Sequence, residues 1–575
     1  MRSQVEQKTA YGNTPELIRD ILNRSAARFG DKTAFMQKED GEYKSYSYRR
    51  YRSDVEALGT ELLCRGLAGK RILVAGENGY AWVVSYMAVV SGVGVVVPVD
   101  RELPAEEFAN IVSISDAGAI LCSDAVARKL ADVSFGDKTP QILLFSELPA
   151  LIESGRSAIN RGVGELFETE IDPEAMAVLL FTSGTTGVSK GVMLSNTNIT
   201  YDIAETARLV DVDDRDTFFS VLPLHHTYEC TIGFLGALYL GATVAFCESL
   251  GRIVKNLSEV KPTVMIAVPL LLETLYKKIN NEIAKRGMEK KVRAAIKATD
   301  FLRPASLAMA AKKKIFADIH RMLGGNLRLL VSGGAPIDPK ILDGLNALGL
   351  RSIQGYGLTE CSPLVTVNPT WAPRSASAGV SLPSGTVDIY NVQEDGTGEI
   401  RYKGKNVMLG YYNMPELTAE VKRGDWFYTG DLGYLDDDGY LYITGRKKNV
   451  IVTAGGKNIF PEELETYLGR NCFVSEAVVV GFINDSKRDY DLVAVIHPDY
   501  DVFRETYGDN FTLTDVEREL TAALDEVNSI VQPYKRMEMF VIRETAFEKN
   551  SSRKIKRNGV APSVIEEYRR KLEER

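Results

Sequence analysis

Residues 181–191 read FTSGTTGVSKG, and this short stretch decides how the rest of the chain is interpreted. It holds three glycines, five hydroxyl side chains and a single lysine. A continuous apolar run over residues 175–181 precedes it, so we expect a loop that hangs from a buried strand. Glycines free backbone N–H groups to wrap a polyphosphate, and hydroxyls add neutral donors. The spacing is not that of the P-loop motif, which argues against a P-loop NTPase. A Gly/Ser/Thr surface turn without function is the alternative.

The composition is that of a globular enzyme with more than one domain. The 575 residues are too many for one hydrophobic core, and 45% of them are hydrophobic. The net charge of −8 argues against nucleic-acid binding, which needs an excess of Lys and Arg. Six scattered cysteines without a CxxC pair, and only four histidines, predict neither a zinc cluster nor a disulfide framework. With a polar N-terminal segment that lacks a signal peptide's apolar core, we expect a cytoplasmic protein.

Two uncharged stretches resemble membrane spans, at residues 81–99 and 230–247. Each contains internal glycines, and the first ends through Pro98. We interpret each as a buried helix, a glycine turn and a buried strand, rather than as a transmembrane helix.

Short apolar runs that alternate with amphipathic helical patterns predict the fold class. The runs include RILVAG, AILCSD and LRLLVSGG, and their rhythm predicts α/β layers with largely parallel sheets. From about residue 385, hairpin-like strands with Gly and Asp turns predict a β-rich subdomain. We therefore expect a large N-terminal domain of layered α/β subdomains plus this β-rich part.

A compact α+β tail is expected after Lys448. Its strands are predicted at residues 477–482, 492–497 and 537–542, and a helix is predicted to begin with a capping box formed by Thr514 and Glu517. We place the domain boundary near residues 446–449. The chain is thus divided into an N-terminal domain, 1–447, and a smaller C-terminal domain, 448–575.

The segment 276–323 departs from the acidic average of the chain. It holds 13 Lys and Arg against 4 Asp and Glu, a net charge of +9. We expect helices, with breaks at Gly287 and Pro304. Two interpretations stay open: a solvated helical excursion, or a surface that meets anionic lipid or a phosphorylated ligand.

The loop at 181–191 closely resembles the phosphate loop of adenylate-forming enzymes, a superfamily that includes acyl-CoA synthetases, luciferases and nonribosomal-peptide adenylation domains. The family pattern is [YF]TSGTTGxPKG, and Val188-Ser189 replaces x-Pro here without removing a donor. The resemblance implies that ATP is bound by Thr182, Ser183, Gly184, Thr185, Thr186, Gly187 and Lys190.

Further motifs follow in the order of that family. LPLHHTYE at 222–229 resembles the motif whose histidine or aromatic residue lies by the substrate carboxylate, a role that falls to His226. Its neighbour His225 is expected to be a packing or surface residue. SGGAP, which contains Gly334, resembles the segment that lies along adenine.

QGYGLTE at 354–360 resembles the next nucleotide motif, which contributes Gln354 and Gly355. The resemblance implies that Tyr356 stacks on adenine and Thr359 hydrogen-bonds the phosphate. It also implies that Glu360 holds Mg²⁺ together with Thr185, because Mg²⁺ needs few protein oxygens beside phosphate and water.

The last motifs concern ribose, the hinge and the thiol. YTGDLG supplies Asp431 as a ribose ligand, and GRKKNVIVTAGGKNIFPEELE supplies Arg446 for ribose and Lys448 as the hinge. The same motif implies a CoA tunnel lined by Gly455, Gly456 and Lys457. SSRKIKR resembles the family segment with the catalytic lysine, here Lys554, although Arg553 replaces the usual glycine.

The resemblance covers about residues 20–560 and implies an acyl-CoA synthetase-like fold with a mobile C-terminal domain. The nearest branch is that of the AMP-forming long-chain fatty acyl-CoA synthetases, because of the PLxHxYE form and the helical excursion. Implied are Mg²⁺, the cosubstrates ATP and CoA, and a fatty acid. Two alternatives stay open: loading of a carrier-protein pantetheine, and a non-catalytic nucleotide- or lipid-binding relative. An oligomer, and a peripheral contact with the inner membrane face through 276–323, are also compatible with the sequence.

Overall fold

The computed structural model describes residues 13–135, 139–163, 166–183, 189–300, 305–454, 457–484, 487, 489–549, 555–557 and 559–573. Two compact units divide the chain. The N-terminal unit comprises Met1–Val387, Tyr402–Phe427 and Gly439–Leu441. The C-terminal unit comprises Asp388–Arg401, Tyr428–Asp438 and Tyr442–Arg575. The boundary expected near 446–449, where the compact α+β tail was predicted to begin, stays a prediction.

A seven-stranded sheet forms one layer of the N-terminal unit, with the strand order β18-β8-β7-β4-β3-β5-β6. Strands β7, β4, β3, β5 and β6 run parallel, and β8 and β18 are antiparallel to their neighbours. The strands are β3 (Lys70–Ala75), β4 (Gly94–Pro98), β5 (Ala117–Cys122), β6 (Gln141–Leu144), β7 (Met176–Ser183), β8 (Ser189–Ser195) and β18 (Gly410–Tyr411).

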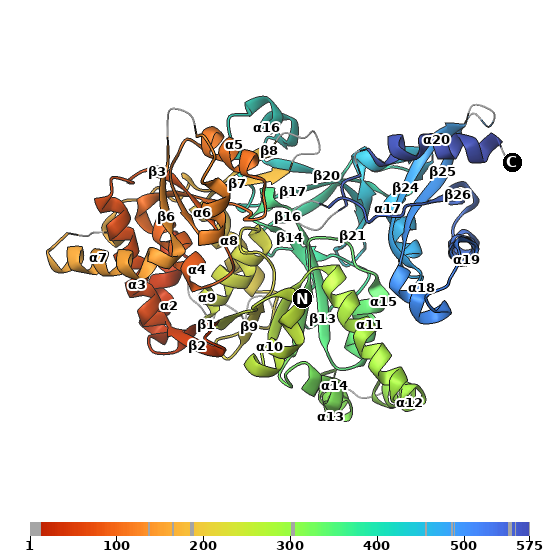
Figure 1. Ribbon diagram of the computed structural model, residues 1–575, viewed down its shortest axis with the longest axis horizontal. Helices are drawn as coiled ribbons and strands as arrows, with labels where there is room; N and C mark the ends of the chain where they lie inside the picture. The colour runs from red at the N-terminus through yellow and green to blue at the C-terminus, as the bar shows by residue number, and fades with distance from the viewer. Residues whose placement is uncertain are drawn as a thin grey trace. The chain divides into compact units, whose positions relative to one another are not determined.

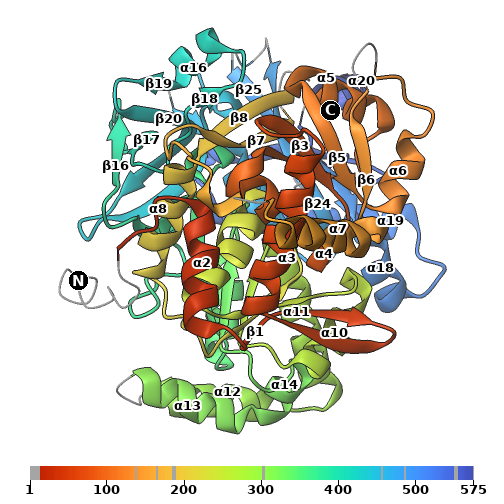
Figure 2. The same cartoon turned by 90° about the vertical axis from the view of Figure 1, so that its left-hand side faces the viewer.

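Helices cover both faces of this sheet. Leu73 and Ala75 of β3 belong to one core cluster with α5 (Ala105–Ser115) and α6 (Asp124–Leu130). The alternate residues of a strand point to the opposite face, where α3 (Tyr48–Cys64), α4 (Tyr80–Ala88) and α7 (Leu148–Asn160) lie (Figures 1 and 2). The layered α/β arrangement expected from the alternating runs is confirmed.

A second sheet of this unit runs in the order β15-β14-β13-β12-β11-β9-β10-β1-β2. From β13 to β1 its neighbours are parallel, and β14, β15 and β2 pair antiparallel. Its strands are β1 (Thr33–Glu39), β2 (Glu42–Ser47), β9 (Thr217–Ser220), β10 (Thr243–Phe246), β11 (Val264–Ala267), β12 (Leu329–Ser332), β13 (Arg351–Gly357), β14 (Leu364–Val367) and β15 (Gly379–Ser381). The remaining helices of the unit are α2 (Ile18–Phe29), α8 (Asn196–Ala207), α9 (Ala237–Leu240), α10 (Ile253–Val260), α11 (Pro269–Lys285), α12 (Glu289–Asp300), α13 (Ala305–Ile315), α14 (Ala317–Met322), α15 (Pro339–Ala347) and α16 (Pro415–Val421).

The hairpin-like strands expected from about residue 385 are present. Strands β16 (Thr386–Tyr390), β17 (Gly398–Lys403), β20 (Trp426–Leu435) and β21 (Tyr440–Arg446) pair in that order, and β19 (Lys422–Arg423) pairs with β20. The turn between β20 and β21 contains Gly439 at a φ of 81°, a conformation that favours glycine.

Both stretches that resemble membrane spans are buried elements of the α/β layers. The first is α4, a turn with Gly92 at a φ of 150°, and β4. The second is a π-helix, η4 (Tyr228–Gly236), then α9, a turn at Gly241 and β10. In the portion of the chain that the structure describes, no helix combines the length and apolar character needed to cross a bilayer.

The C-terminal α+β tail is confirmed. β24 (Val474–Asn484), β25 (Asp489–Pro498) and β26 (Met537–Ile542) form its three-stranded sheet, with β22 (Ile451–Val452) and β23 (Asn458–Ile459) as a separate pair. Alternate residues of β25 belong to two hydrophobic cores on opposite faces of the sheet. Leu492 lies in the core formed with α17 (Pro461–Leu468) and α19 (Leu513–Ile530), and Val493 lies in the core formed with α20 (Val560–Glu573). A further helix, α18 (Tyr500–Tyr507), follows β25.

One expected helix start is wrong by two residues. The capping box of α19 is formed by Thr512 and Asp515, not by Thr514 and Glu517. The Thr512 hydroxyl accepts a hydrogen bond from the Asp515 backbone N–H, and the Asp515 carboxylate accepts one from the Thr512 N–H. Both pairs have the same spacing, so the sequence pattern alone does not separate them.

Candidate functional site

The glycine- and hydroxyl-rich loop joins two antiparallel strands, as expected. Thr182 on β7 lies opposite Lys190 on β8, and Ser183 opposite Ser189. After β8, Ser195 caps α8 by accepting a hydrogen bond from the Asn198 backbone N–H. Gly184, Thr185, Thr186 and Gly187 lie outside the described residues. The strands therefore place Thr182 and Lys190 at the base of the loop.

Lys190 and Glu360 both contact the side chain of Tyr411. The Lys190 ammonium lies 5.4 Å from the centre of the Tyr411 ring. The Tyr411 hydroxyl donates a hydrogen bond of 2.8 Å to Glu360 Oε1. Burial, followed by the charge of Glu360, raises the pKa of Tyr411, so this hydroxyl stays protonated and able to donate. Because β18 pairs with β8 through Tyr411 and Val192, the base of the loop and the carboxylate are joined through one strand pair.

The turn that carries Thr359 and Glu360, η6 (Thr359–Cys361), is held by a buried amide. Asn406 Nδ2 donates to the carbonyls of Cys361 at 2.8 Å and Leu364 at 2.6 Å, and to Asp202 Oδ1 at 3.1 Å. The Met408 backbone N–H donates to the Glu360 carbonyl at 2.8 Å. Burial raises the pKa of Asp202 well above its usual range, against the hydrogen bonds of the Leu364 N–H and Asn406. These contacts hold the turn that carries Glu360.

Strand β13 carries three of the expected nucleotide residues, Gln354, Gly355 and Tyr356. Gln354 Nε2 donates a hydrogen bond of 2.7 Å to the Ser375 carbonyl. A Cβ atom on Gly355 would lie 3.0 Å from the Thr366 carbonyl oxygen, so a side chain there would crowd the neighbouring strand β14. Gly334 follows β12 with a φ of 85°, which favours glycine at this turn.

His226 lies in the turn before η4, where its carbonyl accepts from the Cys230 N–H. Its ring is 4.2 Å, centre to centre, from that of His225. Burial, and then the nearby His226 and Arg101, lower the pKa of His225 well below its usual range, so His225 is neutral. His225 is largely buried against Asp100, with 3.7 Å between Nε2 and Oδ2, so it is a packing residue rather than a surface one.

Glu229 of the same motif is a buried carboxyl to which the sequence pattern assigned no role. It is 1% exposed, and burial raises its pKa to about 8, against a hydrogen bond with Ser220. A Cβ atom on Gly233, one turn later, would lie 2.9 Å from the Glu229 carboxyl carbon, so the glycine leaves room for the carboxyl.

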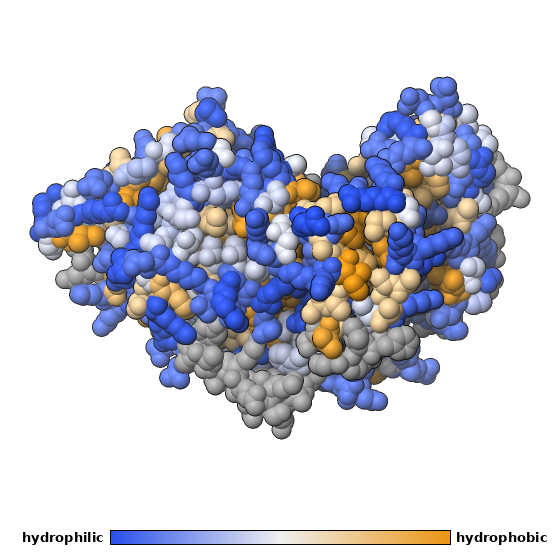
Figure 3. Space-filling model, turned by 90° about the horizontal axis from the view of Figure 1, so that it is seen from below, coloured by the Kyte–Doolittle hydropathy of each residue, from blue (hydrophilic) through white to orange (hydrophobic). Residues whose placement is uncertain are grey.

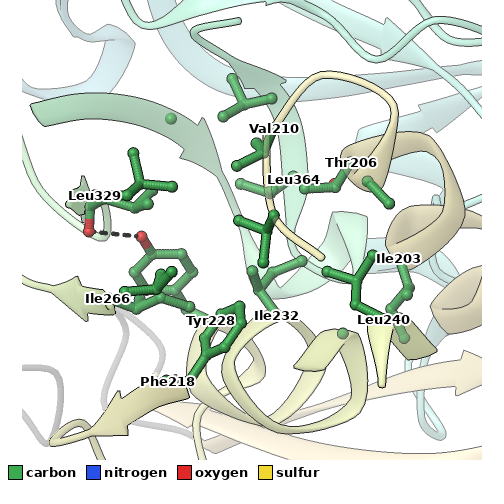
Figure 4. Close-up of a pocket in the computed structure, with 17 residues that line it drawn as sticks. Ile203, Thr206, Val210, Phe218, Tyr228, Ile232, Leu240, Ile266, Leu329 and Leu364 are labelled. Carbon is green, nitrogen blue, oxygen red and sulfur yellow. Dashed lines mark hydrogen bonds between the residues drawn. The ribbon is translucent and has the colours of Figure 1, made fainter. Parts of the chain in front are cut away.

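An apolar cavity adjoins these elements within the N-terminal unit (Figure 4). Its empty volume is about 620 Å³, open mouth included. Side chains of α8, η4 and the second sheet surround it, and nearly all of them are hydrocarbon; among them are Ile203, Val210, Phe218, Ile232, Ile266 and Leu364. Tyr228 is one polar exception, and its hydroxyl is engaged by the Val331 carbonyl at 3.1 Å. Gly355 of β13 also lines the cavity, which connects it to the expected nucleotide strand.

In the C-terminal unit, Asp431 of β20 and Arg446 of β21 form an ion pair, with 2.9 Å between Asp431 Oδ1 and Arg446 Nε. The Asp431 backbone N–H is held by the Thr429 hydroxyl at 3.1 Å. Gly430 has a φ of 71°, so the bend of the strand before Asp431 favours glycine. The two expected ribose ligands are therefore neighbours.

Lys448 lies in a short 3₁₀ turn, η7 (Lys447–Asn449), directly after β21. Both of its neighbours have side-chain partners: Lys447 forms an ion pair with Glu399 at 2.8 Å, and Asn449 donates a hydrogen bond to Glu462 at 2.5 Å. Lys457 lies between β22 and β23, directly before β23, with its ammonium 4.7 Å from the ring centre of Tyr534. Gly455 and Gly456 lie outside the described residues.

Lys554 also lies outside the described residues, but the chain on both sides of it is anchored. Lys549 forms an antiparallel bridge with Ile555. The Arg557 guanidinium pairs with Glu465 at 2.7 Å and donates to the Val479 carbonyl at 3.0 Å. The bridge joins the two flanks of Lys554 to each other, and Arg557 attaches the C-terminal flank to β24 and α17 of the C-terminal unit.

Several polar residues at this site were missed from the sequence: Tyr411, Asn406, Asp202 and Glu229. Tyr411 stands 51 positions after Glu360, and Asn406 stands 204 after Asp202, so no local spacing connects them. In the described parts of the chain, no group of three or more His, Cys, Asp or Glu side chains could hold a metal ion.

Comparison with known proteins agrees with this arrangement. The family model described as AMP-binding enzyme matches residues 22–412. The chain is 28% identical to a long-chain-fatty-acid–CoA ligase, FadD15, of Mycobacterium bovis, over 92% of this chain and 93% of that protein. It is 28% identical to the long-chain-fatty-acid–CoA ligase ACSBG2 of Rattus norvegicus, over 81% and 75%.

Among solved structures, the anthranilate CoA ligase AuaEII in complex with anthranoyl-AMP has the same fold. It superposes with a TM-score of 0.75 at 19% identity, over 97% of this chain and 98% of that one. The family model spans more than half of this chain, and its match begins in α2 and ends just past Tyr411. On these grounds, the chain belongs to the AMP-binding enzyme family.

Proposed function

We propose that this protein is an AMP-forming long-chain-fatty-acid–CoA ligase. A fatty-acid carboxylate oxygen attacks the α-phosphorus of ATP, the bond to the bridging oxygen breaks, and pyrophosphate leaves. The thiol of CoA then attacks the acyl carbon of the acyl-AMP, and AMP leaves. The observation that supports this most is the meeting of Lys190, Tyr411 and Glu360 at the base of the hydroxyl-rich loop.

The nucleotide residues divide into donors and acceptors. Thr182, Lys190 and the loop between them would donate to phosphate oxygens, where negative charge develops during the transfer. Tyr356 would stack on adenine, with Gln354, Gly355 and Gly334 beside it and Thr359 on the phosphate. Asp431 would accept from the ribose hydroxyls, and Arg446, its ion-pair partner, holds that carboxylate in place.

Glu360 fits a Mg²⁺ site. Mg²⁺ favours one or two carboxylates together with substrate phosphates and water, and Glu360 is a partly exposed carboxylate with one oxygen oriented by Tyr411. Glu360 and Thr185 would hold the ion, which supplies neutralisation of phosphate charge when bound.

The apolar cavity is the proposed site of the fatty acyl chain (Figure 4). Each methylene buried there contributes about 0.8 kcal/mol, so the cavity favours long chains over short ones. Gly355 belongs to β13, the proposed nucleotide strand, and also lines the cavity. An acyl chain in the cavity would therefore present its carboxylate toward β13, with His226 beside it.

The C-terminal unit is proposed to serve the two half-reactions in turn. Lys554 would stabilise the charge on the phosphate during adenylation. Rotation of residues 448–575 about Lys448 would then withdraw Lys554 and bring Gly455, Gly456 and Lys457 to the thiol. The anchored flanks of Lys554 support this, because the lysine would move together with its own sheet. A cytoplasmic location is also proposed, on the six scattered cysteines without a CxxC pair in the sequence.

The proposal is tested with a panel of carboxylic acids of increasing chain length, given with ATP, Mg²⁺ and CoA. We expect release of pyrophosphate and AMP in equal amounts, with kcat/KM rising along the series. Product formation with CoA alone would exclude an obligatory carrier-protein acceptor. If no acid supports exchange of pyrophosphate into ATP, the protein is not an adenylate-forming enzyme.

A further inference from the structure

Three polar side chains that are far apart in the sequence lie buried together in the N-terminal unit. Asn198, Asp202 and Asn406 are 4%, 0% and 0% exposed. Hydrophilic side chains ordinarily lie on the surface, as they do over most of the face seen in Figure 3. Burying a polar group costs free energy unless it is hydrogen-bonded, so the partners of these three side chains indicate what they do. The proposed reaction gives none of them a direct role.

Asn198 and Asp202 lie on one side of α8, because they are four positions apart. Asn198 Nδ2 donates hydrogen bonds to the carbonyls of Lys405 at 2.6 Å and Val407 at 3.1 Å. Between these two residues, Asn406 donates through Nδ2 to Asp202 Oδ1 at 3.1 Å. Helix α8 therefore binds three consecutive residues of a segment more than two hundred positions later.

Asn406 also binds the turn η6, which carries Glu360. Its side-chain amide donates to the carbonyls of Cys361 at 2.8 Å and Leu364 at 2.6 Å. Its backbone carbonyl accepts a hydrogen bond of 2.9 Å from the Ser362 hydroxyl. One asparagine therefore holds the chain directly after Glu360 through three hydrogen bonds.

The direction of the Asn406 amide is itself fixed. The hydroxyl of Tyr402, which is 0% exposed, donates to Asn406 Oδ1 at 2.9 Å, so Nδ2 faces the carbonyls of the turn. Asp202 Oδ1 accepts from Nδ2 and also from the Leu364 N–H at 3.2 Å. Burial raises the pKa of Asp202, so its carboxyl is neutral and serves as an acceptor without charge. An asparagine in its place would keep the accepting oxygen.

We propose that Asn406 is a positioning residue for Glu360, the carboxylate assigned to Mg²⁺. Because Asn406 is fully buried, it acts through the turn and not by contact with ATP. It keeps η6 where Glu360 Oε1 accepts from the Tyr411 hydroxyl, and Tyr402 and Asp202 keep Asn406 in place. The inference rests on the proposed function, in which Glu360 holds the metal of Mg·ATP. Residues that orient a metal ligand typically contribute about 10- to 100-fold in metal affinity.

The test replaces Tyr402 with Phe, which removes the hydroxyl that orients the Asn406 amide and keeps the buried ring. Isothermal titration calorimetry measures the binding of ATP to the full-length protein, with and without Mg²⁺ and in the absence of any acid. We expect the Kd of Mg·ATP to rise about tenfold in Tyr402→Phe. The Kd of ATP without Mg²⁺ should be unchanged, because the turn acts on the metal ligand.

Tyr51→Phe is the matched control. Tyr51 of α3 is also 0% exposed, and its hydroxyl donates one hydrogen bond of 2.8 Å, to the Val83 carbonyl. The control should lower the melting temperature as Tyr402→Phe does but bind Mg·ATP like the unaltered protein. An unchanged Kd in Tyr402→Phe, or an equal rise in both variants, would overturn the assignment, since Tyr402 and Asn406 would then only stabilise the fold.

A pair of substitutions at Asp202 tests the neutral acceptor. Asp202→Asn keeps an oxygen for the Asn406 amide and should bind Mg·ATP like the unaltered protein. Asp202→Leu removes that oxygen and should weaken binding of Mg·ATP as Tyr402→Phe does. The same Kd in both Asp202 variants would overturn the part given to Asp202.

Pyrophosphate exchange separates this inference from the proposed function. If the unaltered protein binds Mg·ATP but exchanges with no acid, the proposed ligase is wrong, and the Kd values still decide the role of Asn406. If it exchanges and Tyr402→Phe keeps the Kd of Mg·ATP, only the role of Asn406 is wrong. An unaltered protein that does not bind Mg·ATP would overturn both.

Discussion

Replacing Tyr411 with Phe removes one hydroxyl from the candidate active site and keeps the ring. The hydroxyl donates to Glu360 Oε1 at 2.8 Å, and hydrogen bonds to charged groups contribute about 1.5–3 kcal/mol. At about 1.4 kcal/mol per factor of ten, losing this hydrogen bond corresponds to a roughly 10- to 150-fold increase in the apparent KM for Mg·ATP. The Phe ring preserves the contact with the Lys190 ammonium, now 5.4 Å from the ring centre.

The assay is pyrophosphate exchange into ATP over a range of Mg²⁺ concentrations. We expect a higher apparent KM for Mg·ATP and a higher Mg²⁺ requirement, because Glu360 loses the group that orients it. Tyr412→Phe is the matched control, since it deletes the same hydroxyl one residue later, where the ring lies 5.2 Å from the Arg71 guanidinium. If Tyr411→Phe lowers the melting temperature but keeps the Mg²⁺ dependence of the unaltered protein, Tyr411 supports the fold rather than Glu360.

Three other predictions follow from the same site. Lys554→Ala should slow adenylate formation by roughly a hundredfold or more, yet still convert supplied acyl-AMP and CoA to thioester; equal loss of both steps in rapid-quench assays would contradict the division of roles. Ile232→Trp should fill the cavity and lower kcat/KM for long acids by about fourfold per excluded methylene, while an unchanged chain-length profile would place the acyl chain elsewhere. Glu229→Gln should flatten the pH dependence of stability. Burial raises the pKa of Glu229 from 4.5 to about 8, so its contribution to the free energy of unfolding is complete below the lower value and is lost as the pH rises through the upper one. Urea denaturation at about pH 5 and about pH 8 measures the free energy of unfolding at both values. Between them this free energy should fall less in Glu229→Gln than in the unaltered protein, and an equal fall in both proteins would refute this.

Local patterns in the sequence predicted the elements well. The apolar run into FTSGTTGVSKG predicted a strand and a loop, and the structure has β7, the loop and β8 there. The glycines inside the two membrane-like stretches predicted turns between a helix and a strand, and both turns are present. Strand periodicity, turn chemistry and helix caps act over a few residues, so a short window contains their cause. The two-residue error at Thr512 arose because two equivalent capping patterns overlap.

The sequence by itself determined the fold class, the order of the motifs and the chemistry that the resemblance implied. Only the tertiary structure decided which side chains surround Glu360, because β18 pairs with β8 across more than two hundred residues of chain. It also decided that Asp202 and Glu229 are buried carboxyls with raised pKa values, since burial depends on everything packed around a residue. Such contacts depend on strand order and on long-range packing, whose free energy no local stretch of sequence contains.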